Sequence, residues 1–378
     1  MTPAAAGEAW CQGGGVLVAL VPAALLVGLA VRRSLPLILG EAPPRPGRGP
    51  VVELSLAGLA IAGWWWEVRS LGQLPPGLTP VDEACVCLRL VAHLLLVVLL
   101  AAAAWVDLRH RVIPDAITVP GVLVGLAWNA LFPTTLLPIG RPVERSFAPP
   151  ELVPDVLGAF GPLVGSGMPP WLTGAAGLAV MLLIFAVWWW FGLPTAAGEP
   201  SELQAESYAE PWPRWLNPVV ALAGGLGIVA TWLTGAHHWA GLVTALVGLA
   251  VAAGIIWAVR VGASLAMGRE AMGFGDVTLM AMAGAWLGWQ PCVLACVLAV
   301  FIGLAHGLTQ LIRHSESELP FGPSLCLALA VVVIAWRPLW QAAAPQFEDP
   351  AVMAAVVAFV IVMTAATLAV WARLRRRG

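Results

Sequence analysis

Long apolar runs separated by short polar breaks make up most of the chain. A helix that crosses a membrane needs about 20 apolar residues, within a range of about 17–25. Eleven runs approach this length, although the eighth is short and the tenth is marginal. The pattern therefore predicts an all-α fold, a polytopic membrane helix bundle with about 9–11 transmembrane helices. The candidate spans are 15–31, 51–66, 86–106, 116–132, 172–192, 216–234, 239–259, 277–289, 291–312, 322–336 and 350–371.

The composition also indicates that the chain lies in a lipid bilayer. Of its 378 residues, 60% are hydrophobic and 11% are charged, and the mean hydropathy is +0.87. A soluble domain carries about 25% charged residues. The net charge of −2 comes without a basic patch, so no nucleic-acid partner is expected. The six cysteines form no CxxC pair, which argues against a zinc ribbon or a thioredoxin-like site, and we expect no metal site.

The arginines predict the orientation of the chain. All 19 basic residues are arginines, and cytoplasmic loops collect basic residues. If the N-terminus lies outside, fourteen arginines fall on the inner side, and five fall outside, namely Arg69, Arg89, Arg141, Arg145 and Arg337. We therefore expect the N-terminus outside and the C-terminus, which ends in RLRRRG, in the cytoplasm.

Two carboxylates stand out at the ends of candidate spans, where acids are costly and are candidates for function. In WVDLRHRVIPDAITVPG (105–121), Pro114 breaks the helix, so Asp115 is explained as an N-cap of the following span. Asp107 lies at a helix C-terminus, where the macrodipole disfavours a negative charge. The nearby Arg109, His110 and Arg111 offer a purely structural explanation, since they could neutralise it.

The second carboxylate is Asp276 in AMGFGDVTLM (271–280). Gly273 and Gly275 permit backbone angles and close approaches that other residues cannot make. A tight turn with Asp276 as a helix N-cap is the structural alternative. We expect the two glycines to leave room for an extended substrate backbone to reach Asp276.

The predicted topology places Asp107 and Asp276 at the same membrane face. Two carboxylates brought close together cannot both ionise easily, so one keeps its proton. Aspartic proteases use a pair of carboxyl groups that share one proton. The chain contains no HExxH motif, no P-loop and no recognisable Ser–His–Asp or Cys–His arrangement that would compete with this interpretation.

Three motifs now resemble a known family. GFGD fits the GxGD signature of membrane aspartic proteases, and MGFGDVTLMAMAGAWLGW (272–289) looks like the corresponding stretch of the prepilin peptidases, or type IV leader peptidases. DLRHRVIPD (107–115) resembles that family's other acidic motif, and LPFGPSLCLA (319–328) is similar to its PFGP segment. The motifs follow the family's order, and the resemblance covers about 86–132 and 240–336.

This resemblance implies a membrane aspartic endopeptidase with Asp107 and Asp276 as the catalytic pair. Its substrates would be type IV pilin-like or pseudopilin precursors, cleaved after a Gly at the cytoplasmic face of a bacterial inner membrane. Peptide cleavage would need no cofactor. S-adenosylmethionine would be needed only if the N-methyltransferase activity of bifunctional members is retained. Residues that would support the site or lie near the substrate are Gly273, Gly275, Pro114, Asp115, Arg109 and Arg111.

The chain departs from the family pattern in three ways. It lacks the paired CxxC motifs of the N-terminal region, it has Thr278 where the family commonly has Lys, and its two acidic motifs are unusually far apart. We predict five segments: an N-terminal membrane segment with a Pro-rich loop (1–85), a peptidase core with the first Asp motif (86–132), an insertion (133–238), a peptidase core with the GxGD motif (239–336), and a C-terminal span with a basic tail (337–378).

The predicted insertion contains an acidic inner loop. Glu199, Glu202, Glu206 and Glu210 are spaced for one face of a short helix. They form either a solvated face or a docking surface for a basic leader peptide.

Two alternative functions stay open. A presenilin-like intramembrane protease also uses GxGD, but Val106 precedes Asp107 where that class has Tyr, and no PAL motif occurs. A transporter or an assembly scaffold with intramembrane carboxylates would also have many spans and broken helices.

Overall fold

The computed structural model describes residues 15–38, 51–74, 83–138, 170–192, 216–268, 272–312 and 321–375. Throughout these residues the regular structure is helical and no strand occurs. The predicted all-α, polytopic helix bundle is therefore confirmed.

Each of the eleven candidate spans coincides with a helix, because each long apolar run must satisfy its backbone groups internally. The principal helices are α2 (Gly15–Ile38), α3 (Val51–Gly63), α4 (Glu83–His110), α5 (Asp115–Leu131), α7 (Ala175–Gly192), α9 (Leu216–Thr234), α10 (Ala236–Met267), α11 (Gly275–Leu287), α12 (Trp289–Ile312), α13 (Phe321–Ile334), α14 (Trp336–Glu348) and α15 (Pro350–Arg375). Three short elements complete the description: η1 (Trp64–Arg69), η2 (Pro133–Thr135) and α6 (Pro170–Thr173).

Six of the described helices are long and apolar enough to cross a membrane, and α13 with α14 would make a seventh if the bent pair is one span. Three shorter apolar helices lie within α5, α7 and α15. Helix α11 has only 13 residues, although every residue from Asp276 to Leu287 is buried. It is therefore a core helix enclosed by its neighbours.

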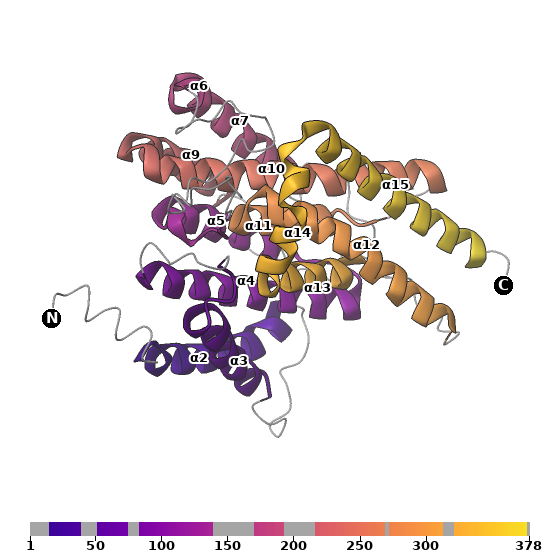
Figure 1. Cartoon of the computed structure of the whole chain (residues 1–378), viewed down its shortest axis with the longest axis horizontal. Coiled ribbons are helices and arrows are strands. Elements are labelled where there is room, and N and C mark those ends of the chain that lie inside the picture. The colour runs from indigo at the N-terminus through magenta and orange to yellow at the C-terminus, as the bar shows by residue number, and fades with distance from the viewer. Residues whose placement is uncertain are drawn as a thin grey trace.

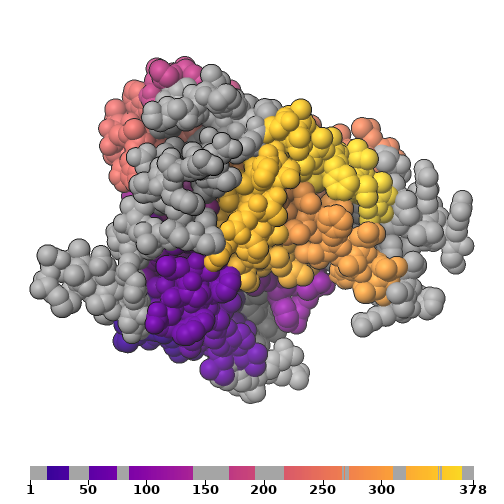
Figure 2. Space-filling model, viewed as in Figure 1, coloured from indigo at the N-terminus to yellow at the C-terminus, as the bar shows by residue number. Residues whose placement is uncertain are grey.

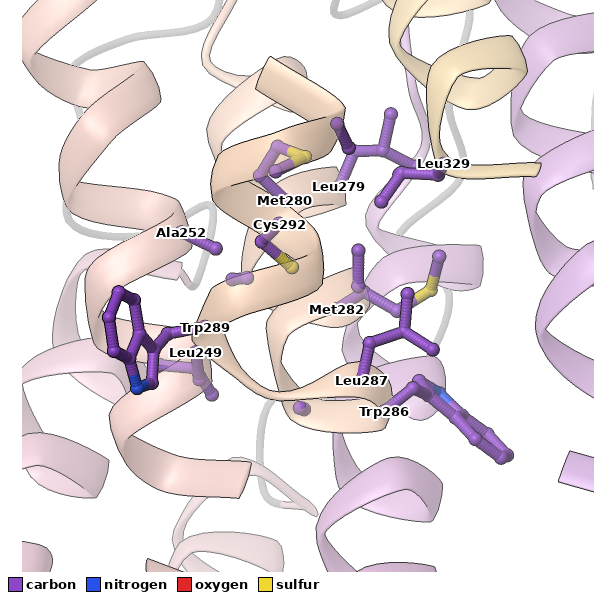
Figure 3. Close-up of a cluster of buried hydrophobic side chains, with 14 of the residues drawn as sticks. Leu249, Ala252, Leu279, Met280, Met282, Trp286, Leu287, Trp289, Cys292 and Leu329 are labelled. Atoms are coloured by element: carbon purple, nitrogen blue, oxygen red, sulfur yellow. The ribbon is translucent and has the colours of Figure 1, made fainter. Parts of the chain in front are cut away.

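Helix α11 occupies the centre of the bundle, in contact with α4, α5, α10, α12 and α13 (Figure 1). Figure 3 shows its Leu279, Met280 and Met282 within a cluster of buried hydrophobic side chains that also includes Cys292 of α12 and Leu329 of α13. Glycines allow the close approach. Met282 fills the space beside Gly121 of α5. The result is a closely packed support for the residues at the start of α11.

The carboxyl end of α11 is fixed by side chains of α5 and by its own tryptophan. Asn129 Nδ2 donates to the carbonyls of Ala285 and Trp286 at 2.7 and 3.1 Å. Trp286 Nε1 donates to the carbonyl of Gly121 at 2.9 Å. The two Asn129 bonds satisfy carbonyls in the last turn of α11, which a helix end leaves without an intrahelical partner. The register of α11 against α5 is thereby set.

The described part of the predicted insertion packs on the core helix α10. Trp239 Nε1 of α10 donates to the carbonyl of Leu172 at 2.9 Å, and Trp232 Nε1 of α9 donates to that of Thr173 at 2.7 Å. Two indoles thus hold the short helix α6 against α9 and α10. The acidic loop with Glu199, Glu202, Glu206 and Glu210 lies outside the described residues.

The sequence did not predict α14. The chain bends by 95° between α13 and α14. Trp336, Trp340 and Phe347 form a row of aromatic contacts along α14, and Phe347 reaches Trp289 at the start of α12, with ring centroids 5.4 Å apart. In Figure 2 the yellow surface of α14 and α15 borders both the violet N-terminal part and the orange surface of α12. The expected loop at 337–349 is therefore mostly a helix that packs across the bundle.

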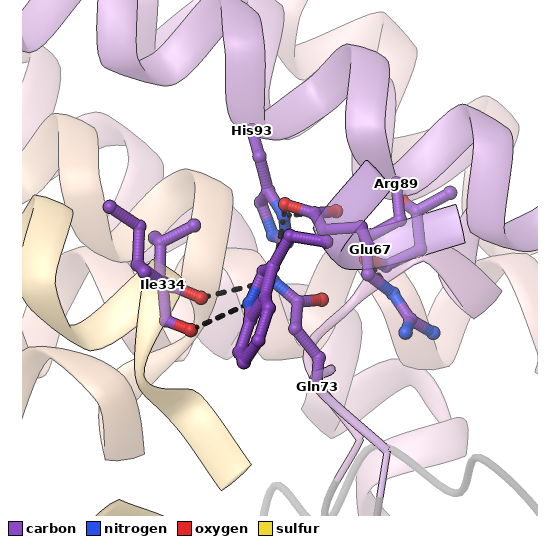
Figure 4. A network of polar contacts seen from close by, with 8 residues as sticks. Glu67, Gln73, Arg89, His93 and Ile334 are labelled. Atoms are coloured by element: carbon purple, nitrogen blue, oxygen red, sulfur yellow. Dashed lines mark hydrogen bonds and ion pairs between the residues drawn. The ribbon is translucent and has the colours of Figure 1, made fainter. Parts of the chain in front are cut away.

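A buried polar cluster joins η1 and α4 to the bend between α13 and α14 (Figure 4). His93 Nδ1 of α4 lies 2.8 and 2.9 Å from the two carboxylate oxygens of Glu67 in η1. Gln73 Nε2 donates to the carbonyl of Val333 at 3.0 Å, and Trp66 Nε1 donates to that of Ile334 at 2.9 Å. These carbonyls belong to the last turn of α13. The side chains of Trp66 and Gln73 therefore cap that helix end.

We expect His93→Leu to lower the stability of the bundle by about 1–3 kcal/mol, because a buried carboxylate loses its hydrogen-bond partner. Glu67 is only 6% exposed, so water cannot replace the imidazole. His93→Gln is the matched control, since its amide can still donate to Glu67. Thermal unfolding in detergent should give a clearly lower Tm for the Leu variant than for the Gln variant. Equal Tm values would contradict the inferred pairing.

Candidate active site

Asp107 lies in the last turn of α4 and is buried, with 6% of its surface exposed. The helix closes after His110, and the N–H of Arg111 donates to the Asp107 carbonyl at 2.8 Å. Arg111 has φ of 57°, the left-handed conformation that usually terminates a helix at Gly. A non-glycine residue held there stores strain, which is common near functional sites. The turn directs the chain straight to Ile113 and Pro114.

Asp276 lies in the first turn of α11 and is also buried, with 8% exposed. Phe274 takes the position before the helix, so the structural alternative, in which Asp276 itself caps α11, is not what the structure shows. A carboxylate in the first turn lies at the positive end of the helix dipole. The Thr278 side chain is buried, and its hydroxyl donates to the Gly275 carbonyl at 3.0 Å within the first turn of α11.

The structure brings the two carboxylates together. Asp107 and Asp276 are close enough to interact electrostatically, although they come from different helices far apart in the sequence. Cys326 of α13 lies within electrostatic reach of both. Two neighbouring carboxyl groups can act as a general acid and a general base when one of them is protonated and the other is ionised.

All three sequence motifs meet around Ile113. A Cβ atom added to Gly275 would lie 2.9 Å from Ile113 Cβ and 3.2 Å from its carbonyl oxygen. A Cβ added to Gly322, in the PFGP segment, would collide with Asp107 Oδ2 and lie 3.1 Å from Ile113 Cδ1. The Ile113 side chain therefore packs against both the GxGD segment and the PFGP segment.

The two glycines of GFGD differ in their surroundings. Gly273 is exposed, and the nearest atom to a Cβ built there is Gly275 N at 3.9 Å. At Gly275 the space is already filled by Ile113. The expectation that both glycines leave room for a substrate backbone is therefore wrong for Gly275, where the close contact with Ile113 requires the glycine. At Gly273 it stays a prediction.

The remaining predicted residues surround the turn between α4 and α5. Pro114 ends the break between the helices, as predicted, and occupies the position before α5. Asp115 is the first helical residue and half-buried, so it lies one position beyond the expected N-cap. The guanidinium of Arg109 lies over the Trp105 ring, 4.4 Å from its centroid. Arg109 and Arg111 are both exposed.

Arg260 is a supporting residue that the sequence did not reveal. Its Nε donates to the Met272 carbonyl at 3.0 Å, and its guanidinium lies 5.7 Å from the Phe274 ring centroid. Arg260 therefore holds the segment before Asp276 against α10. A single charge in the long apolar run of α10 was the available signal. Within the described ranges, no group of three or more His, Cys, Asp or Glu is arranged to hold a metal ion.

Residues 214–308 match the family described as the type IV leader peptidase family. The match includes Asp276 but begins inside the predicted insertion, so it also includes α9. It does not extend to 86–132, where Asp107 lies, or to Gly322. Asp107 thus joins the site through its position in the structure and its sequence motif.

Individual proteins show the same similarity. Over 76 residues the chain is 42% identical to a prepilin leader peptidase/N-methyltransferase of Pseudomonas aeruginosa, covering 19% of this chain and 26% of that protein. It is 36% identical over 104 residues to one of Aeromonas hydrophila, covering 24% and 36%. It is 33% identical over 96 residues to one of Escherichia coli, covering 24% and 43%. These alignments span less than half the length of the relatives. No solved structure matches the chain.

Proposed function

We propose that the protein is a membrane aspartic endopeptidase that removes the leader peptide of type IV prepilin-like or pseudopilin precursors, because residues 214–308 match the type IV leader peptidase family. The observation that carries this proposal is the buried pair of Asp107 and Asp276. One acid lies inside the matched segment and the other lies outside it, yet folding brings them together.

The chemistry follows from a carboxylate pair that shares one proton. The ionised carboxylate takes a proton from water, whose oxygen bonds to the scissile carbonyl carbon. The protonated carboxyl group gives its proton to the carbonyl oxygen. The tetrahedral intermediate then collapses and the C–N bond breaks. The leaving amine takes the proton that the first carboxylate took from water, and a hydroxyl of the intermediate returns a proton to the second carboxylate. Helix α11 begins beside Asp276, and helix α13 begins beside Asp107. The positive ends of these two helix dipoles stabilise the one negative charge that the pair of acids keeps.

We further propose that the pair lies at the cytoplasmic face of a bacterial inner membrane, with the N-terminus outside and the C-terminus cytoplasmic. The arginine distribution supports this orientation. The apolar helix of a precursor would stay in the bilayer beside the bundle. Its leader would extend into the cytoplasm.

A cleavage assay with purified full-length protein tests the proposal. The protein in detergent or lipid is mixed with a synthetic pilin-like precursor, and the products are identified by mass spectrometry. We expect one cut, directly after a Gly that precedes the apolar segment. If no precursor is cut, the alternative of a transporter or an assembly scaffold is favoured.

Peptide cleavage by this scheme consumes only water, and we propose no cofactor for it. The relatives named above are also N-methyltransferases, so the same assay should include S-adenosylmethionine. A mature product heavier by one methyl group would show that the second activity is retained. Unmethylated product would restrict the protein to peptidase chemistry.

We propose that the acidic loop attracts the basic leader. Replacing Glu199, Glu202, Glu206 and Glu210 together by Gln should raise the apparent KM at low salt, because long-range attraction between opposite charges is then screened least. The increase should vanish at high salt, where such charges are screened. An unchanged KM at low salt would contradict docking and leave the loop as a solvated face.

A further inference from the structure

We propose that Gly322 is a positioning residue that fixes the carboxylate of Asp107 for catalysis. This inference rests on the proposed peptidase function. It assigns a role to the PFGP segment, which lies outside the residues that match the family. Gly322 is buried, as is Asp107.

The geometry leaves no space between the two residues. Gly322 is the second residue of α13, and a Cβ atom there would clash with Asp107 Oδ2. On the other side, Ile113 Cδ1 would lie 3.1 Å from the same Cβ. The carboxylate therefore rests against bare backbone, and Ile113 limits its movement along that surface. A methyl group at position 322 would have to push Asp107 or Ile113 aside.

The position in α13 adds an electrostatic reason for this contact. The first N–H groups of a helix have no intrahelical acceptor and carry partial positive charge. Gly322 brings the first turn of α13 against Asp107, while Asp276 lies in the first turn of α11. Displacing Asp107 would change its distance from Asp276 as well as from this helix end. The sharing of a proton between the two acids depends on both distances.

Kinetics of precursor cleavage test the proposal, with Gly322→Ala compared with wild type. We expect kcat to fall about 100-fold, since misplacing a reacting group by about 1 Å can have this effect. KM should stay within about twofold, because the contact fixes a reacting group rather than the substrate. The pH dependence of kcat should also shift, which a general loosening of the fold would not produce.

Gly303→Ala is the matched control. Gly303 of α12 lies beside the same segment, but a Cβ there would be 3.8 Å from the Phe321 ring, an ordinary contact. We expect wild-type kcat for this variant. If Gly322→Ala also cleaves at the wild-type rate with an unchanged pH profile, the positioning role is wrong even though the peptidase function stands.

A stability measurement tests the contact without using activity. Gly322→Ala should lower the Tm of the full-length protein in detergent. In an Asp107→Ala background, where the carboxylate is absent, the same substitution should lower the Tm by roughly half as much or less. Equal losses in both backgrounds would overturn the proposed contact. If the contact is found but wild type cleaves no precursor, the proposed function fails rather than the geometry.

Discussion

Asp107→Asn and Asp276→Asn are each expected to reduce leader removal at least about 1,000-fold, because an amide can act neither as the base nor as the acid of the pair. The side chains are nearly the same size, so each variant should still insert and fold. Both acids are buried, and a buried pair of like groups is costly. We therefore expect each variant to have a Tm equal to or above that of wild type.

Asp349→Asn provides the control for this experiment. Asp349 is exposed and its Oδ1 accepts the N–H of Ala351 at 2.8 Å, which caps the start of α15. Asn can form the same bond, so cleavage and Tm should match wild type. The decisive measurement is the single-turnover rate of precursor cleavage at equal protein concentration. Substantial cleavage by either the Asp107→Asn or the Asp276→Asn variant would rule out the proposed aspartic mechanism.

The sequence predicted the helices well because an apolar segment in a bilayer must satisfy its backbone hydrogen bonds internally, which favours a helix for each apolar run. It missed α14, whose aromatic residues Trp336, Trp340 and Phe347 alternate with polar residues and two prolines. Their spacing fits one face of a helix, but no hydropathy criterion detects so amphipathic a segment. The 95° bend before it depends on packing against distant helices.

The site was predictable only in part. Asp107 and Asp276 were identified because the topology placed two costly acids at one face. The roles of Ile113 and Gly322 are contacts between motifs, and no spacing rule reports which atoms of one motif meet another. The same limit explains why Glu67 and His93 were missed. Each is an isolated polar residue in the sequence, and only folding reveals the pair.

The contact between α10 and α11, which holds Asp276 in place, should be as sensitive to substitution as the Asp276 carboxylate. Gly248 of α10 and Gly284 of α11 touch backbone to backbone: a Cβ at Gly248 would collide with the Gly284 carbonyl oxygen and lie 2.7 Å from Gly288 Cα. Small residues permit such close helix contacts in membranes. We expect Gly248→Ala to destabilise the protein by roughly 3 kcal/mol, since overpacking here must move backbone rather than a flexible side chain.

Gly254→Ala on the same helix separates overpacking from a change in helix propensity. A Cβ at Gly254 meets nothing within 4 Å, and Ala favours a helix over Gly by about 1 kcal/mol. This variant should therefore unfold at or slightly above the wild-type Tm, while Gly248→Ala unfolds well below it. Because α11 begins with the turn that carries Asp276, Gly248→Ala should also slow precursor cleavage at temperatures where it remains folded. If both variants kept wild-type stability, α10 and α11 could separate at little cost. The tight contact between them would then not be what positions Asp276.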